Sequence, residues 1–260
     1  MSSVSSIDSV QQLNPMTSAG KIDPYAIFKL NFEALGGEKQ VRYDTNYHYK
    51  GEIELNDYTF ELEEYEIRPS KNLRKISSNF KVLYRSGDDG YRQWAFQEEK
   101  LSTVEDYNSS ERVVREMYKD YKYTDPKDKL FTSKATRKIS VDGTLCYEVV
   151  INNRKTNEVY KHYYDADNFL LKREINYKDN EITQTDFSDY RDVGNIKMAF
   201  TKDISFLDTG SKQKISYSKI EKGVYISDKI FFPPEQEEET QDYSKLVDTS
   251  TTGQNVDYYA

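Results

Sequence analysis

The chain has 260 residues, carries a formal net charge of −8, and is 36% hydrophobic. Its mean hydropathy of −0.89 is low for a folded chain, but its 23 tyrosines and 12 phenylalanines can build a core, because aromatic side chains bury large areas. Acidic and basic residues are interleaved without a basic stripe, which argues against nucleic-acid binding. No run reaches the ~20 apolar residues that a membrane helix needs, and the single cysteine, Cys146, excludes an internal disulfide framework.

The N-terminal part combines a polar segment with one amphipathic helix. Residues 1–22 are polar and rich in serine, so we expect them to be disordered, and we recognise no export signal among them. Asp23 and Pro24 are typical of an N-cap and of the first helical position. They predict a helix that ends at Gly36 and Gly37, because glycine readily adopts the left-handed backbone conformation that ends many helices.

Period-two alternation after this helix predicts long antiparallel strands. Residues 41–55 alternate between an apolar and a polar face, as in a strand with one buried face. We expect a second strand from residue 58, with a bulge near Glu63 where the alternation changes phase. Phe80 lies on one face of an expected third long strand, and a fourth strand is centred on Trp94.

The middle of the chain predicts a second helix, over residues 108–123. Asn108 and Glu111 fit a capping box, and apolar residues, among them Met117, recur behind it at helical spacing. This helix lies between two sheet regions. It is either a plug in the core or a movable lid, and the sequence leaves both alternatives open.

The second half of the chain alternates strands with turn signals such as Asp142-Gly143. We expect seven strands, near residues 135–141, 145–152, 157–164, 169–178, 181–190, 196–207 and 212–221. Spacing of roughly 8–12 residues indicates an antiparallel sandwich or barrel-like sheet. Residues 236–260 are acidic and nearly without aliphatic side chains, so we expect disorder there.

The sequence contains no recognisable catalytic or metal-binding constellation. Its two histidines, His48 and His162, lie in separate expected strands, and no HExxH, CxxC or EF-hand pattern occurs. We therefore expect no catalysis, no metal and no cofactor. A long sheet that curls around helices leaves an apolar hollow, which suits small apolar ligands. The residues expected to line it are Tyr43, Tyr47, Phe60, Phe80, Trp94 and Met117.

Four stretches resemble the LolA-like family of outer-membrane lipoprotein-sorting proteins. The family begins with a helix, a Gly-Gly end and a long first strand. The corresponding stretch of this chain, which resembles that opening, is FKLNFEALGGEKQVRYDTNYHYKGEIEL. The family's strand-turn-strand motif resembles EIRPSKNLRKI, which contains Arg68, Pro69 and Arg74. The family's next hairpin is similar to the stretch RSGDDGYRQWAF of this chain, which contains Trp94. The family's last strand is similar to the stretch GVYISDKIFFPP.

This resemblance implies one domain over residues 23–235. It would be an unclosed, strongly curved antiparallel half-barrel of about 10–11 strands, with helices packed in its concave face. The implied function is that of a bacterial carrier, periplasmic or tethered at the outer membrane, which shelters the acyl chain of a lipid or lipoprotein and meets a protein partner there. Arg68 is the position that would latch the helical lid to the sheet.

The apolar face of the first strand departs from this pattern, because it is rich in tyrosine where a lipid cavity favours aliphatic side chains. The tyrosines suit either a packed core or a ligand-lining surface. The alternative to a carrier is therefore a non-catalytic structural or interaction module of the same fold, which has a filled core and binds a protein partner.

Overall fold

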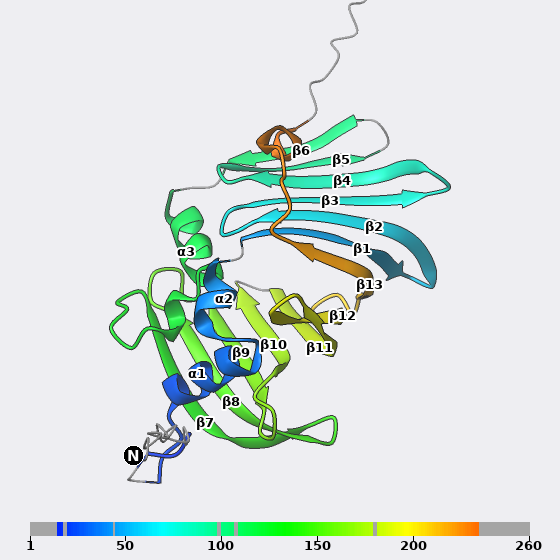
Figure 1. Cartoon of the computed structure of the whole chain (residues 1–260). Helices are drawn as coiled ribbons and strands as arrows, with labels where there is room; N and C mark the ends of the chain where they lie inside the picture. Colours follow the sequence, from blue (N-terminus) through cyan, green and yellow to red (C-terminus); the bar gives the residue numbers. More distant parts are fainter. Residues whose placement is uncertain are drawn as a thin grey trace, which may run out of the picture.

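The computed structural model describes residues 15–17, 20–43, 45–97, 100–106, 109–178 and 181–233. Its strands form one 13-stranded sheet in the order β6-β5-β4-β3-β2-β1-β13-β12-β11-β10-β9-β8-β7 (Figure 1). Neighbouring strands are antiparallel, and in the described part of the chain the edge strands β6 and β7 do not pair with each other. The predicted mainly-β, antiparallel and unclosed architecture is confirmed, with 13 strands instead of 10–11.

The first half of the sheet contains six strands: β1 (Asn46–Leu55), β2 (Tyr58–Ile67), β3 (Lys71–Ser78), β4 (Lys81–Asp89), β5 (Arg92–Gln97) and β6 (Lys100–Asp106). The expected third long strand was wrong, because β3 and β4 are separate strands. Asn79 and Phe80 form the turn between them with φ of 50° and 65°. Two left-handed residues in succession are typical of a tight two-residue hairpin.

The first strand also begins later than expected. Helix α1 (Pro24–Ala34) lies where the sequence predicts it, and the side chain of Asp23 accepts a hydrogen bond from the Tyr25 amide. A second, short helix, α2 (Glu38–Tyr43), then replaces the predicted start of the strand. Val41 is buried and the Arg42 Nε lies 2.9 Å from the Glu38 carboxylate one turn away, so both hydrophobic burial and an ion pair stabilise this turn.

The bulge predicted near Glu63 was wrong as well. Strand β2 pairs with β1 and with β3 without a register shift. The shift in this region lies between Lys50 and Gly51, on the side of β1 that pairs with β13. A Cβ on Gly51 would lie only 2.2 Å from the carbonyl oxygen of Ser216, so only glycine fits this close approach.

The second half of the sheet contains seven strands: β7 (Phe131–Val141), β8 (Thr144–Asn153), β9 (Val159–Asp165), β10 (Leu171–Lys178), β11 (Glu181–Val193), β12 (Ile196–Phe206) and β13 (Lys212–Lys222). All seven were predicted, with boundaries that differ by a few residues. Helix α3 (Ser109–Lys119) and the 3₁₀ turn η1 (Lys122–Thr124) connect the two halves, and Figure 1 shows α3 beside their junction.

We call the face of the sheet against which α1 and α2 pack the inner face. Phe32 of α1 and Val41 of α2 pack with Tyr47 and Tyr49 of β1, and Phe28 packs with Tyr164 of β9. The end of α1 sits directly on the β11–β12 turn: the Lys197 amide donates to the Leu35 carbonyl at 2.9 Å. These contacts fix both helices over the second half of the sheet (Figure 1).

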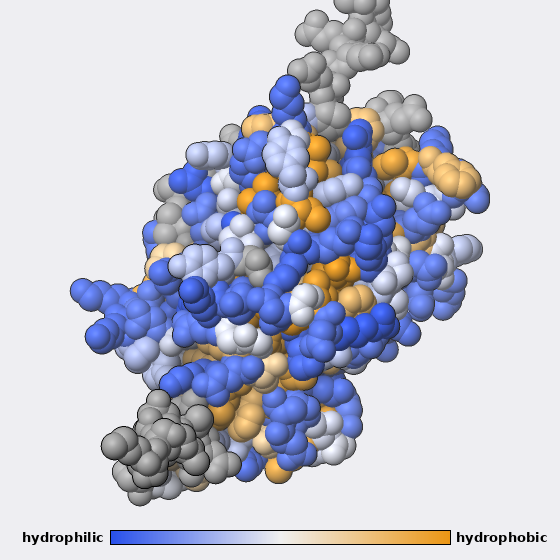
Figure 2. Space-filling view, in the orientation of Figure 1, coloured by the Kyte–Doolittle hydropathy of each residue, from blue (hydrophilic) through white to orange (hydrophobic). Residues whose placement is uncertain are grey.

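The outer face of β3–β5 has a separate small core. The 3₁₀ turn η2 (Asp228–Phe231) covers it, and Phe231 packs against Leu73 and Trp94. The Trp94 Nε1 donates to the Phe231 carbonyl at 2.7 Å. Figure 2 shows a surface that is mostly hydrophilic, with hydrophobic atoms gathered over the middle of the molecule.

Some predictions fall outside the described residues. They are most of the disorder expected for residues 1–22, the disorder expected for residues 236–260 and the cap at Asn108. Within residues 1–22 the structure describes an isolated β-bridge between Met16 and Ile22. Among the helices described, none has both the length and the apolar character needed to cross a membrane.

Candidate functional site

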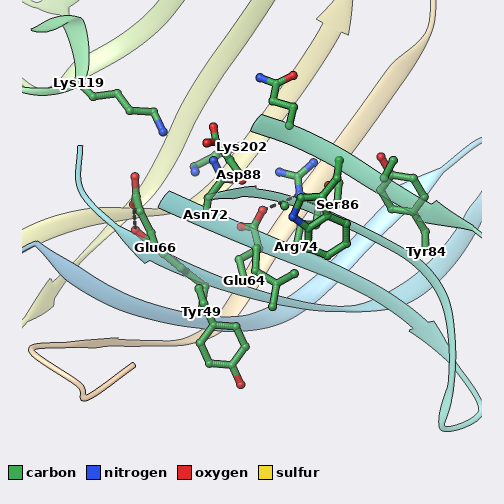
Figure 3. Close-up of a pocket in the computed structure, with 16 residues that line it drawn as sticks. Tyr49, Glu64, Glu66, Asn72, Arg74, Tyr84, Ser86, Asp88, Lys119 and Lys202 are labelled. Carbon is green, nitrogen blue, oxygen red and sulfur yellow. Dashed lines mark hydrogen bonds and ion pairs between the residues drawn. The ribbon is translucent and has the colours of Figure 1, made fainter. Parts of the chain in front are cut away.

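Two adjoining cavities lie against the inner face. The larger one, which we call the polar cavity, has a volume of about 540 Å³ (Figure 3). Its charged lining residues come from β2, β3, β4, α3 and β12: Glu64, Glu66, Arg74, Asp88, Lys119 and Lys202. The smaller one, the aromatic cavity, has a volume of about 290 Å³. Both cavities are lined by Tyr49, Glu66 and Lys202, which therefore form their common border.

The carboxylate of Glu64 lies at the centre of the polar cavity. Its Oε1 is 2.6 Å from the Arg74 Nε, and the Tyr217 hydroxyl donates to its other oxygen. Burial by itself raises the pKa of Glu64, but the charges of Arg74 and Lys202 together with these hydrogen bonds outweigh burial and lower it. Glu64 is therefore ionised at neutral pH.

The carboxylate of Glu66 follows on the same face of β2. It accepts a hydrogen bond from the Tyr49 hydroxyl at 3.0 Å and lies 3.5 Å from the Arg68 Nε. Burial raises the pKa of Glu66, but the positive charges of Arg68, Lys119 and Lys202 outweigh burial and lower it. Glu66 is thus a second ionised carboxylate between several cations.

Asp88 is the most buried acid of the cavity, with 2% of its surface exposed. Its Oδ1 accepts a hydrogen bond from the Gly90 amide at 2.8 Å, and the Arg115 guanidinium of α3 forms an ion pair with it. Burial outweighs these contacts and raises the pKa of Asp88. The ion pair fastens α3 to the end of β4.

Lys119 and Lys202 differ from the other charged groups of the cavity. Among the residues that the structure describes, neither has a carboxylate within ion-pair distance, and Lys202 donates to the Tyr217 hydroxyl at 3.3 Å. Burial lowers the pKa of both amines, and the positive charge of Arg115 lowers that of Lys119 further. The cavity therefore contains two ammonium groups that are influenced by the Glu64, Glu66 and Asp88 carboxylates but form no direct ion pair with them.

Rings dominate the aromatic cavity. Its lining includes Tyr47, Tyr121, Tyr123, Tyr164, Phe187 and Tyr190, with Leu35, Val41, Leu171, Ile196 and Met198. Arg68 lies at its wall, where its guanidinium is 4.8 Å from the centre of the Tyr47 ring and its Nη1 donates to the Tyr121 hydroxyl at 3.1 Å. This hydrogen bond joins the end of β2 to the segment between α3 and η1.

The structure separates the residues that the sequence analysis placed in one hollow. Tyr47 lines the aromatic cavity, whereas Phe60 and Met117 pack at the edges of two different core clusters. Trp94 borders the polar cavity, but its indole ring packs in the outer-face core over Gly87, whose missing Cβ leaves room for it.

Two of the predicted lining residues are solvent-exposed, and for them the prediction was wrong. Tyr43 is 74% exposed because it belongs to α2 and not to the first strand. Phe80 is 98% exposed because it sits in the β3–β4 turn. Both errors come from extending a period-two pattern beyond the strand, into helix α2 at Tyr43 and into a turn at Phe80.

The sequence analysis missed the charged residues of the polar cavity, although a signal was present. Met198, Phe200 and Ile204 form an apolar period-two row on β12, and Lys202 interrupts that row. On β2, Glu64 and Glu66 continue the inward row that begins with Phe60 and Leu62. A charge in an apolar row indicates a functional cavity when the other residues of that row are buried.

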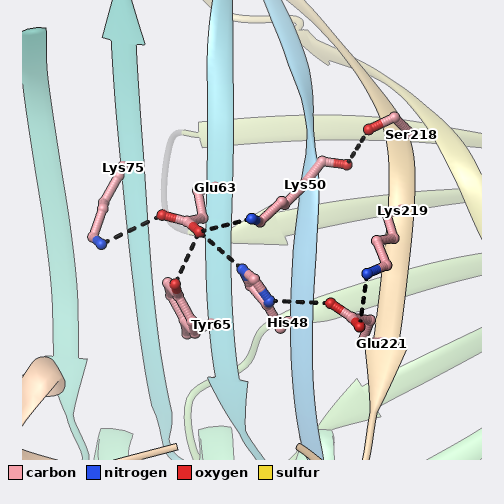
Figure 4. Close-up of polar contacts among 8 residues, drawn as sticks. All are labelled: His48, Lys50, Glu63, Tyr65, Lys75, Ser218, Lys219 and Glu221. Atoms are coloured by element: carbon pink, nitrogen blue, oxygen red, sulfur yellow. Dashed lines mark hydrogen bonds and ion pairs between the residues drawn. The ribbon is translucent and has the colours of Figure 1, made fainter. Parts of the chain in front are cut away.

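The two histidines lie in separate clusters. His48 is on the outer side of β1, where its Nε2 is 2.9 Å from Glu63 and its Nδ1 is 3.5 Å from Glu221 (Figure 4). Lys75 and the Tyr65 hydroxyl also contact Glu63, and together they lower its pKa although burial raises it. This cluster joins four neighbouring strands, β3, β2, β1 and β13.

His162 is buried and contacts α3. Its Nε2 is 2.7 Å from the Tyr118 hydroxyl and 2.9 Å from Glu174, and its Nδ1 is 2.9 Å from the Tyr164 hydroxyl. Burial raises the pKa of Glu174, but the contact with His162 and the hydrogen bond from Tyr118 lower it overall. This network holds the C-terminal end of α3 on β9 and β10.

No protein-family model matches the sequence, and no curated protein sequence matches it. Solved structures do match. A DUF1329 family protein from Desulfovibrio piger is 16% identical, with a TM-score of 0.54 over 80% of this chain and 96% of that one. An outer membrane lipoprotein-sorting protein domain from Vibrio parahaemolyticus is 10% identical, with a TM-score of 0.54 over 78% and 94% of the two chains.

A LolA superfamily protein from Nitrosomonas europaea is 13% identical, with a TM-score of 0.51 over 78% of this chain and 97% of that one. At such low identity these matches establish the fold alone. They confirm the resemblance suggested by the sequence motifs: the chain has the fold of the LolA superfamily.

Proposed function

We propose that the protein is a non-catalytic, LolA-like carrier, periplasmic or tethered at the outer membrane, that shelters the acyl chain of a lipid or lipoprotein. The chain would lie on the inner face of a strongly curved half-barrel. The observation that supports this proposal is the aromatic cavity of about 290 Å³ beside a polar cavity of about 540 Å³. Together they fall in the range of about 300–1,000 Å³ that is typical of ligand sites.

An amphiphile suits this pair of cavities. Its acyl chain would enter the aromatic cavity, where each CH₂ removed from water contributes about 0.8 kcal/mol. Its polar end would remain in the polar cavity beyond the border formed by Tyr49, Glu66 and Lys202. The protein would then present the cargo to a protein partner at the outer membrane.

In this proposal Arg68 acts as the latch of a lid formed by α3 and η1. The hydrogen bond from Arg68 to the Tyr121 hydroxyl supports such a role. An acyl chain that enters between Tyr47 and Tyr121 would separate these groups and release the lid.

Native mass spectrometry of the purified protein, followed by lipid extraction, tests the proposal. We expect a bound lipid, or uptake of an added fluorescent fatty acid. Leu171→Trp should fill the aromatic cavity and weaken uptake by about tenfold, a loss of about 1.4 kcal/mol. Leu207→Trp is the matched control, because Leu207 is 52% exposed.

The interaction module with a filled core is the second candidate, and the ion-paired lining of the polar cavity favours it. A protein that carries no lipid and takes up no fatty acid, with identical results for Leu171→Trp and Leu207→Trp, would establish this candidate in place of the carrier.

A further inference from the structure

We propose that the polar cavity binds an oxyanion, the phosphate or carboxylate of an amphiphile's headgroup, between Lys119 and Lys202. This inference depends on the proposed function only for the acyl chain that is attached to the headgroup. The two lysines reach the cavity from different elements, since Lys119 is the last residue of α3 and Lys202 lies on β12. Figure 3 shows the side chain of Lys119 extending toward the group of charges around Lys202.

The existing contacts explain why an anion is expected and a cation is not. Each carboxylate of the cavity already has a guanidinium partner: Glu64 pairs with Arg74, Glu66 with Arg68, and Asp88 with Arg115. The two lysines remain, so this site carries an excess of positive charge within a chain whose net charge is −8. An oxyanion that accepts hydrogen bonds from both ammonium groups would neutralise this excess.

Burial strengthens the argument. An ammonium group that leaves bulk water without a counter-ion destabilises the folded state. Burial lowers the pKa of both lysines, and the nearby carboxylates, among them Glu66, offset only part of this effect. A bound anion would reduce this cost, and the neutral lining residues Asn72 and Ser86 carry further hydrogen-bond donors. An anion between the two lysines would therefore offset the part of the burial cost that the carboxylates leave.

The position of Lys119 links this site to α3. An anion held by both lysines would bridge the end of α3 and the sheet, in addition to the Arg115–Asp88 ion pair. Headgroup binding would thus hold the lid closed at one end while the acyl chain displaces Arg68 at the other. Cargo with an acidic headgroup would be retained longer than neutral cargo.

Isothermal titration with four probes tests this inference: dodecanoate, dodecyl phosphate, monolaurin as the neutral amphiphile, and inorganic phosphate. We expect both anionic amphiphiles to bind at least about tenfold more tightly than monolaurin. Lys119→Met and Lys202→Met should each weaken the binding of both anionic amphiphiles by about tenfold. The affinity for monolaurin should stay the same in both variants. Lys119→Arg should retain the preference, because it preserves the charge.

Lys155→Met is the control for the change in net charge, because Lys155 is exposed in the turn after β8. Thermal unfolding verifies that each variant folds. Tight binding of all three amphiphiles without an anionic preference would overturn the headgroup site and leave the carrier intact. Binding of inorganic phosphate alone, lost in Lys119→Met, would support the site and contradict the carrier. Absence of binding by any anion would overturn the inference.

Discussion

The aromatic cavity and the polar cavity share three residues but are built on opposite principles. Around the aromatic cavity, rings from α1, η1 and β9 fill space: Phe28 packs edge-to-face on Tyr123 and on Tyr164, with centroids 5.3 Å and 6.0 Å apart. Around the polar cavity, ion pairs such as Glu64–Arg74 replace hydrophobic contacts. The first arrangement stabilises the fold by burying apolar surface, whereas the second adds less net stability because attraction between the charges must offset their desolvation.

Strand β2 shows how one segment serves both arrangements. Its inward row begins with Phe60 and Leu62, which pack in the core, and continues with Glu64 and Glu66, which face the polar cavity. At that point its outward row turns apolar, and Tyr65 packs at the edge of the core that η2 covers. The hydrophobic side of the strand changes face because a different element covers the sheet there.

The largest expected effect comes from removing a ring beside the aromatic cavity. Phe28→Ala should lower the free energy of unfolding by about 3–4 kcal/mol, because Phe28 is 2% exposed and the surrounding rings collapse only partly. Urea unfolding measures the change. Phe80→Ala is the control and should cost less than about 0.5 kcal/mol; equal losses would contradict the assignment of the core.

A smaller loss of stability is expected for the ion pair between Glu64 and Arg74 in the polar cavity. Arg74→Met should destabilise the protein by about 2 kcal/mol, because it leaves the buried Glu64 carboxylate without its guanidinium. Glu64→Leu in the same chain should restore most of this stability, as a double-mutant cycle will show. The exposed pair Arg191–Asp189 is the comparison, and Arg191→Met should leave the stability nearly unchanged, because solvent screens an exposed ion pair.

The Glu174 network predicts a pH dependence. Folding lowers the pKa of Glu174 from its usual 4.5, so the ionised carboxylate stabilises the protein above that value, and this contribution disappears as the pH falls through the lowered value. Glu174→Gln should therefore cost about 1 kcal/mol at pH 7 and progressively less in acid. Unfolding curves recorded from pH 7 to below pH 4 measure the difference in stability between Glu174→Gln and the unchanged protein. A difference that stays constant with pH would contradict the proposed network.

The smallest effect has the opposite sign. Lys119→Met should raise the stability of the unliganded protein by about 0.5 kcal/mol, since folding disfavours the buried ammonium. A lowered pKa means that this cost is present at neutral pH and vanishes as the pH rises through the usual value of 10.5. Thermal unfolding beside the Lys155→Met control measures it, and a destabilised Lys119→Met would show that the lysine has a structural partner.

Much of this architecture was predictable from local patterns. The cap at Asp23, the Gly36-Gly37 end and the seven strands after residue 130 were all recognised, because each depends on neighbours close in sequence. Tyr43 and Phe80 were misplaced, because period-two spacing does not distinguish a strand from a short helix or a turn that continues it.

The polar cavity could not be predicted in the same way. Its charges come from β2, β3, β4, α3 and β12, and in the sequence each is one more charged residue in a polar chain. Lys202 interrupts an apolar row and was the available signal, but the other charged residues of the cavity lie far from it in the sequence, and even the nearest of them, Lys119, is in the other half of the chain. Only the pairing of β1 with β13 brings these segments to one surface.

The sequence by itself determined the class of the protein: an antiparallel sheet, its turns, its first helix and the motifs of a LolA-like fold. These follow from alternation, capping and turn chemistry, which are properties of short segments. The tertiary structure decided which face of each strand is buried, that Trp94 belongs to the outer core, and that Lys119 and Lys202 share a cavity. Those outcomes depend on what covers each part of the sheet, and the covering elements are distant in sequence.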